Sequence, residues 1–135
     1  MRIALVLSLC LVLAGCSENA QQRAARRTVD HFYAALKAHD AKTACGLISQ
    51  PVADAMLNAF GEQGRACVPG MRHLFHRVAT GKDPGFFDGV PTVRAVTVDG
   101  DHAIVTIKRN YQRRRVGLTR IGDRWQITGS PKSQG

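Results

Sequence analysis

Hydrophobic residues in the first two thirds of the chain recur with the period of an α-helix. In residues 20–39 and again in residues 69–79 they are spaced i, i+3, i+4 and i+7, which places them on one side of a helix. Two shorter helices are expected between them. Residues 41–48 follow Asp40, whose carboxylate can accept from the free amides of a helix start. Residues 51–60 open with Pro51, which the first turn of a helix tolerates. The two spaced sets are Val29, Phe32, Tyr33 and Leu36, and Met71, Leu74, Phe75 and Val78.

The hydrophobic period changes to two after residue 91. Residues 80–91 contain three glycines and two prolines and are expected to form a loop. Alternating apolar residues then predict strands joined in hairpins, with turns at Asp99-Gly100 and Gly122-Asp123. Helices followed by antiparallel strands predict an α+β fold, with the helices covering one face of a curved sheet of about four strands. The alternating residues are Val96, Val98, Ala103, Val105, Ile107, Val116, Leu118, Trp125 and Ile127.

This order of elements resembles the nuclear transport factor 2-like superfamily, a cone-shaped α+β fold. The resembling segments are VDHFYAALKAHDAKTACGLIS, VTVDGDHAIVTI and IGDRWQI, which spread over residues 24 to 129. They are packing patterns without signature chemistry. The resemblance therefore implies a fold, a cone able to take an apolar or amphipathic ligand, and a sheet through which members often pair with a second copy.

The N-terminus has a third pattern. Residues 3–14 are almost wholly apolar but too short to span a bilayer, which takes ~20 helical residues. Preceded by Arg2, they have the form of an export signal. The next residues complete the sequence Leu13-Ala14-Gly15-Cys16, which resembles the lipobox of bacterial lipoproteins. The resemblance implies cleavage before Cys16, a diacylglycerol thioether on its sulfur and, in many bacteria, an acyl group such as palmitate on its amine. An ordinary signal peptide and an uncleaved anchor are the alternatives.

The leader predicts how the rest of the chain is organised. Residues 1–15 are expected to be a signal peptide, 16–23 a lipidated tether, 24–130 a single domain and 131–135 a tail. Two lipid chains anchor a protein stably, whereas one holds it only marginally. We therefore expect the protein to be anchored to the cell membrane or outer membrane and to face the periplasm or exterior.

Two cysteines remain beyond the leader and Cys16. In an exported chain this even remainder predicts a disulfide between Cys45 and Cys67, worth about 3 kcal/mol in the chain-entropy model. The alternative is a metal site that adds His73 and His76. Its spacing matches no usual zinc pattern, and both histidines fall opposite the hydrophobic side of their helix. We therefore expect surface histidines, with no metal and no cofactor.

The chain is strongly basic, with a formal net charge of +9 at pH 7. Outside the cell this charge indicates anionic headgroups or wall polymers as partners, not nucleic acid, although it also serves solubility. The arginines near the tether are close enough to a lipid anchor to press the domain onto a membrane. The run at residues 108–115 is equally explained as a charged strand edge that prevents sheets from pairing. The candidate contacts are Arg23, Arg26, Arg27, Lys108, Arg109, Arg113, Arg114 and Arg115.

Catalysis by this fold would need an acid or base in the cone. Tyr33 lies roughly where the resembling isomerases keep an oxyanion-stabilising tyrosine, but the region of their carboxylate base reads Ser49-Gln50-Pro51. Asp54 follows on a predicted helix. We therefore interpret Tyr33 as a core residue, and the protein as an envelope lipoprotein that binds a ligand or protein without turnover. A cyclase or isomerase type of enzyme and a structural subunit of an envelope complex are the alternatives.

Overall fold

The computed structural model describes residues 17–82 and 89–130, and these confirm the predicted α+β class and order of elements. The predicted lipobox with Cys16, the tail and part of the predicted loop lie outside the described residues. The helices are α1 (Ala20–Lys37), α2 (Ala41–Gly46), α3 (Gln50–Ala59) and α4 (Cys67–Ala79). The strands are β1 (Thr92–Asp99), β2 (His102–Arg109), β3 (Gln112–Ile121) and β4 (Arg124–Gly129).

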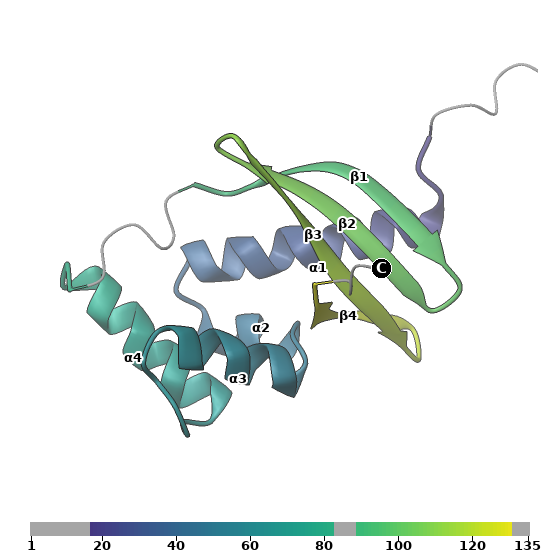
Figure 1. The fold of residues 1–135 in the computed structure, drawn as a ribbon. Coiled ribbons are helices and arrows are strands. Elements are labelled where there is room, and N and C mark those ends of the chain that lie inside the picture. The colour runs from purple at the N-terminus through teal and green to yellow at the C-terminus, as the bar shows by residue number, and fades with distance from the viewer. Residues whose placement is uncertain (1–16, 83–88, 131–135) are drawn as a thin grey trace, which may run out of the picture.

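The four strands form one antiparallel sheet in the order β1-β2-β3-β4, and α1 lies along one face of it (Figure 1). The core fills the space between them. Of the predicted helical stripe, Tyr33 is half-buried and the other three members are buried. All described core residues lie between Ala25 and Ile127, so a protein that begins at residue 17 retains every one of them. The core residues from α1 and the sheet include Val29, Phe32, Leu36, Ala103, Val105, Ile107, Leu118, Trp125 and Ile127.

Helices α2, α3 and α4 pack together beside the C-terminal half of α1 (Figure 1). The predicted disulfide between Cys45 of α2 and Cys67 of α4 is present, with 5.9 Å between the two Cα atoms. Gly70 allows α4 to approach α3 closely, because a Cβ at this position would lie 2.8 Å from Cδ1 of the buried Leu57. Asp40 caps α2 as predicted, accepting a hydrogen bond from the Thr43 amide.

The segment between α2 and α3 covers the free edge of β4. Ile48 forms a parallel bridge with Ile127, the Ser49 amide donates to the Ile127 carbonyl at 2.8 Å, and the Ile127 amide donates to the Leu47 carbonyl at 2.9 Å. These bonds occupy groups that an exposed edge would offer to another chain.

Two consecutive glutamines fasten the start of α1 to both edge strands. Gln22 donates from Nε2 to the Val96 carbonyl of β1 at 3.2 Å, and the Trp125 indole of β4 donates to Oε1 of Gln21 at 3.1 Å. Gln22 also forms a capping box with Asn19, which satisfies the free amides of the helix start. The register of α1 on the sheet is therefore set by side-chain bonds as well as by packing.

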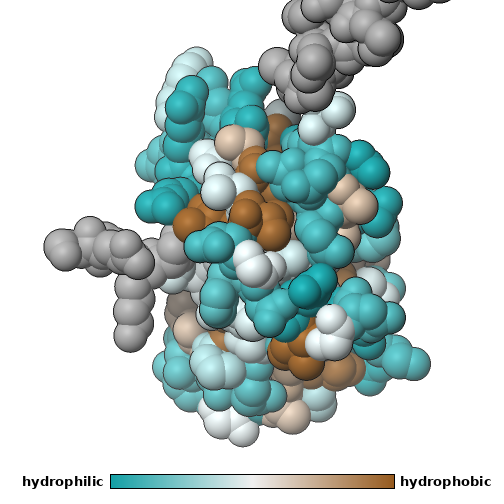
Figure 2. Space-filling model, turned by 90° about the vertical axis from the view of Figure 1, so that its right-hand side faces the viewer, coloured by the Kyte–Doolittle hydropathy of each residue, from teal (hydrophilic) through white to brown (hydrophobic). Residues whose placement is uncertain are grey.

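The face of the molecule seen in Figure 2 is mostly hydrophilic, and hydrophobic groups reach its surface only in separate places. Among the described helices, none is both long and apolar enough to cross a membrane.

Candidate functional site

A cavity of about 160 Å³ opens between the C-terminal half of α1, α3, residues 89–90 and the β2–β3 hairpin. Its volume is close to that of an apolar protein cavity that holds one benzene molecule, about 150 Å³. Apolar side chains form part of its wall, and hydrogen-bond donors from α1 and the hairpin form the rest. The lining residues are Phe32, Tyr33, Leu36, Lys37, Met56, Gly89, Val90, Arg109 and Arg114.

Strand register divides the basic run at residues 108–115 between the two faces of the sheet. Arg114 lies opposite the buried Ile107, so its side chain is on the concave face that lines the cavity. Arg113 and Arg115 lie opposite Lys108 and Thr106, on the convex face, because successive strand residues point to opposite sides. The interpretation of this run as a strand edge fits β3, because the pairing of β3 with β4 covers only residues 117–121 and leaves residues 112–116 without a partner on that side among the described residues. It does not fit Lys108 of β2, which is paired on both sides.

Tyr33 connects the core to the cavity. Its ring packs edge-to-face against Phe32, with 5.4 Å between the ring centroids, and its other side lines the cavity. Burial raises the pKa of the Tyr33 hydroxyl above its usual value, although the positive charges of Arg109 and Arg114 oppose this shift. The phenol is therefore protonated at neutral pH and is able to donate a hydrogen bond. Tyr33 packs against the core, as expected, and is also part of the site.

The described lining of the cavity is positively charged. It includes Lys37, Arg109 and Arg114 and contains neither Asp nor Glu. Cations above a low-dielectric apolar wall focus a field that attracts anions, and guanidinium groups bind carboxylate or phosphate through paired hydrogen bonds. Asp54, the acid nearest the expected position of a base, is exposed on α3 and accepts from Nε2 of Gln50 at 2.7 Å.

A second polar cluster, which the sequence did not predict, surrounds Glu62 in the turn between α3 and α4. Its side chain is only 3% exposed, yet it is bonded to three basic side chains. The distances are 2.6 Å to Nδ1 of His73, 2.9 Å to a terminal nitrogen of Arg77 and 2.7 Å to Nε of Arg65. Burial raises the pKa of Glu62, but the bonds from His73 and Arg77 and the nearby charges outweigh it and leave the pKa below its usual value. The cluster joins the turn to α4.

The histidines are on the surface, as predicted, although His73 is engaged by Glu62. His76 is exposed on the same helix. Within the described ranges, no three His, Cys, Asp or Glu side chains are grouped so that they could hold a metal ion.

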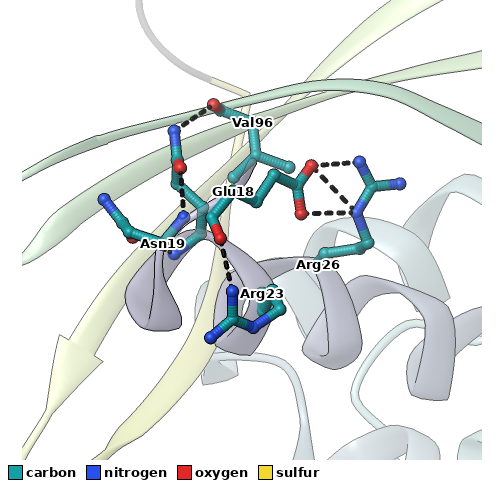
Figure 3. A network of polar contacts seen from close by, with 6 residues as sticks. Glu18, Asn19, Arg23, Arg26 and Val96 are labelled. Carbon is teal, nitrogen blue, oxygen red and sulfur yellow. Dashed lines mark hydrogen bonds and ion pairs between the residues drawn. The ribbon is translucent and has the colours of Figure 1, made fainter. Parts of the chain in front are cut away.

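The arginines near the N-terminus lie on α1, which begins inside the expected tether. Arg26 forms an ion pair with Glu18, and Arg23 donates to the Glu18 carbonyl (Figure 3). The hydrogen bond from Arg26 is the main cause of the lowered pKa of Glu18. Arg27 is exposed. Arg23 and Arg26 therefore hold Glu18, which precedes α1, against the first turns of the helix.

No protein-family model matches the chain, and no curated protein and no solved structure matches it either.

Proposed function

We propose that the protein is a lipid-anchored envelope protein whose domain, of the nuclear transport factor 2-like type, binds a small amphipathic anion in the cavity beside α1. One observation carries this proposal: donors from Tyr33, Lys37 and Arg114 surround the same cavity as the apolar side chains of Leu36 and Met56. A site that combines an apolar wall with a few convergent polar groups is typical of small-molecule binding.

The cavity defines the ligand class. Its volume of about 160 Å³ accommodates a phenyl ring or a short branched alkyl group. The cationic side chains then favour a carboxylate or phosphate at the other end of the molecule. Larger ligands would extend from the cavity along the surface.

The lining supports binding more than turnover. Proton abstraction needs a base within hydrogen-bond reach of the substrate, and the described lining offers no carboxylate. Tyr33 is a poor base at neutral pH because its pKa is raised. In contrast, the protonated phenol of Tyr33 and the guanidinium group of Arg114 are suited to donate hydrogen bonds to a resting anion.

The envelope location is supported by two features of the chain. Residues 13–16 have the form of a lipobox directly after a short apolar run. The disulfide between Cys45 and Cys67 is of a kind that persists in oxidising compartments and is rare in the cytosol. Mass spectrometry of the native protein tests the anchor: we expect a polypeptide that begins at Cys16 and carries glyceryl lipid, and retention of residues 1–15 would contradict it.

Binding is tested by titration calorimetry on a protein that begins at residue 17. The probes are phenylbutyrate and phenylbutanol, which share an apolar part and differ in the anionic group. We expect the acid to bind at least about tenfold more tightly, as a charge-assisted hydrogen bond implies. Equal affinity for the two probes, or binding of neither, would contradict the proposal.

A further inference from the structure

The convex face of the β2–β3 hairpin carries three cations. Lys108 and Arg113 are directly opposite each other across the strand pair, and Arg115 lies two pairs further along, opposite Thr106. The chain contains no Asp or Glu between Asp101 and Asp123. We call Lys108, Arg113 and Arg115 the convex basic cluster.

Repulsion between the charges of the convex basic cluster destabilises the isolated domain. Like charges that face each other across a strand pair destabilise a sheet. Some other surface cations have partners, as Arg120 does in its ion pair with Asp101 at 2.8 Å. In the described part of the chain, no carboxylate forms an ion pair with a member of the convex basic cluster. An external anionic surface would remove the repulsion.

The tip of the same hairpin presents an aromatic ring. Tyr111 is 98% exposed, at a turn that Asn110 closes with a φ of 55°, and Figure 1 shows this turn projecting from the body of the domain. A tyrosine ring with a polar end is favoured at the boundary between headgroups and acyl chains of a bilayer. A solvated wall polymer offers no apolar layer for such a ring.

We infer that the convex basic cluster and Tyr111 dock the domain onto the surface of an anionic lipid bilayer. Charge complementarity supplies the attraction, and the ring at the tip distinguishes a bilayer from a soluble polyanion. Arg109 and Arg114 line the cavity on the concave face. Docking and ligand binding therefore use opposite faces of the same two strands.

The start of α1 is on the face of the sheet opposite the convex basic cluster, because α1 covers the concave face (Figure 1). The lipid anchor proposed above would keep the domain near a bilayer without deciding which face meets it. The attraction of the hairpin for anionic lipid does not depend on that anchor.

The test is vesicle binding by the protein that begins at residue 17, with vesicles of phosphatidylcholine alone or mixed with phosphatidylglycerol. The test variant carries Lys108→Gln, Arg113→Gln and Arg115→Gln. The matched control removes the same charge elsewhere, through Lys42→Gln, Arg72→Gln and Lys82→Gln, all at exposed positions. Each base near an anionic leaflet strengthens binding about fivefold. We therefore expect the test variant to bind the anionic vesicles on the order of 100-fold more weakly, and the control to be much less affected.

Equal losses in the two variants would overturn the inference, because binding would then follow net charge alone. Tyr111→Ser provides an independent readout: we expect it to weaken vesicle binding but not the binding of soluble polyphosphate. If polyphosphate outcompetes anionic vesicles at equal charge and Tyr111→Ser has no effect, the partner is a polyanion and not a bilayer. The test variant should keep its affinity for phenylbutyrate and should be at least as stable as the parent, so failure of the cavity proposal is distinguishable from failure of this one.

Discussion

Arg114 lies directly opposite Ile107 across the β2–β3 pair, and this single register relationship brings its charge to the cavity. Ile107 is buried against the core, so the residue across from it is on the same concave face. The next residue, Arg115, is on the other face. Two arginines adjacent in sequence are thereby assigned to different surfaces and different roles.

Replacing Arg114 separates these roles. We expect Arg114→Gln to weaken phenylbutyrate binding about tenfold, through loss of a charge-assisted hydrogen bond. Arg115→Gln removes the same charge from the convex face and should leave the affinity within about twofold at moderate ionic strength. Calorimetric titration of both variants measures the difference, and equal losses would show that the cavity does not select between the two arginines.

The titration of Tyr33 reports its burial. The chain has two tyrosines, so the Tyr111→Phe variant leaves the phenolate absorbance of Tyr33 alone. We expect its pKa to lie above the usual value near 10, because burial disfavours the phenolate. The unfolded chain then ionises first. This contribution to stability is present below about pH 10 and is lost as the pH rises through the pKa of the folded protein.

Removing the charge of Arg114 should raise the pKa of Tyr33 further. The charge of Arg114 lowers the pKa of Tyr33, so Arg114→Gln is expected to raise it. An unchanged or lower pKa in the variant would contradict the arrangement of the two side chains around one cavity.

The Glu62 cluster should stabilise the turn between α3 and α4. We expect Glu62→Gln to lower the free energy of unfolding by about 2 kcal/mol, because buried charge-assisted hydrogen bonds are weakened. Urea unfolding measures the loss. Glu18→Gln, which removes a carboxylate from a surface ion pair, is the control and should change stability much less.

The Glu62 carboxylate also makes part of the stability of the protein sensitive to acid. Its pKa is lowered in the folded state, so the contribution is present above the usual Glu pKa and is lost as the pH falls through the lowered value. Glu62→Gln should flatten this part of the pH profile of unfolding. A profile identical to that of the parent would contradict the role of the cluster.

Loss of the disulfide should destabilise the fold without changing the cavity. The bond closes a loop between residues 22 positions apart, for which the chain-entropy model gives about 3 kcal/mol. The double variant Cys45→Ser and Cys67→Ser is expected to unfold at lower urea concentration and still bind phenylbutyrate when folded. An unchanged urea midpoint would show that the covalent bond adds nothing to the packing of α2 on α4.

Much of the fold was predictable because it depends on local periodicity. The stripe containing Val29 and Phe32 indicated α1, and the alternation of Val105 and Ile107 indicated β2, since burial on one side of an element produces these periods. The disulfide followed from the count of cysteines once the leader was set aside. Each of these predictions uses residues that are close in sequence or a constraint that holds for the whole chain.

The cavity was less predictable because it depends on contacts between distant elements. Which arginines of residues 108–115 face inward follows from the register of β2 on β3 and the position of their turn, and the sequence alone did not assign it. Continuing the alternation from the predicted core residues Val116 and Leu118 back to Arg114 was the available signal. The sequence signal for the Glu62 cluster was weaker, because the partners of Glu62, His73 and Arg77, lie on another element, α4.

The most direct test of ligand binding in the cavity uses the methionines. A protein that begins at residue 17 has two, Met56 in the cavity wall and Met71, which is 0% exposed in the core. With methyl-labelled methionine, NMR titration with phenylbutyrate should shift the Met56 methyl resonance progressively and leave that of Met71 nearly unchanged. A Met56 resonance that stays fixed at saturating phenylbutyrate would contradict binding in this cavity.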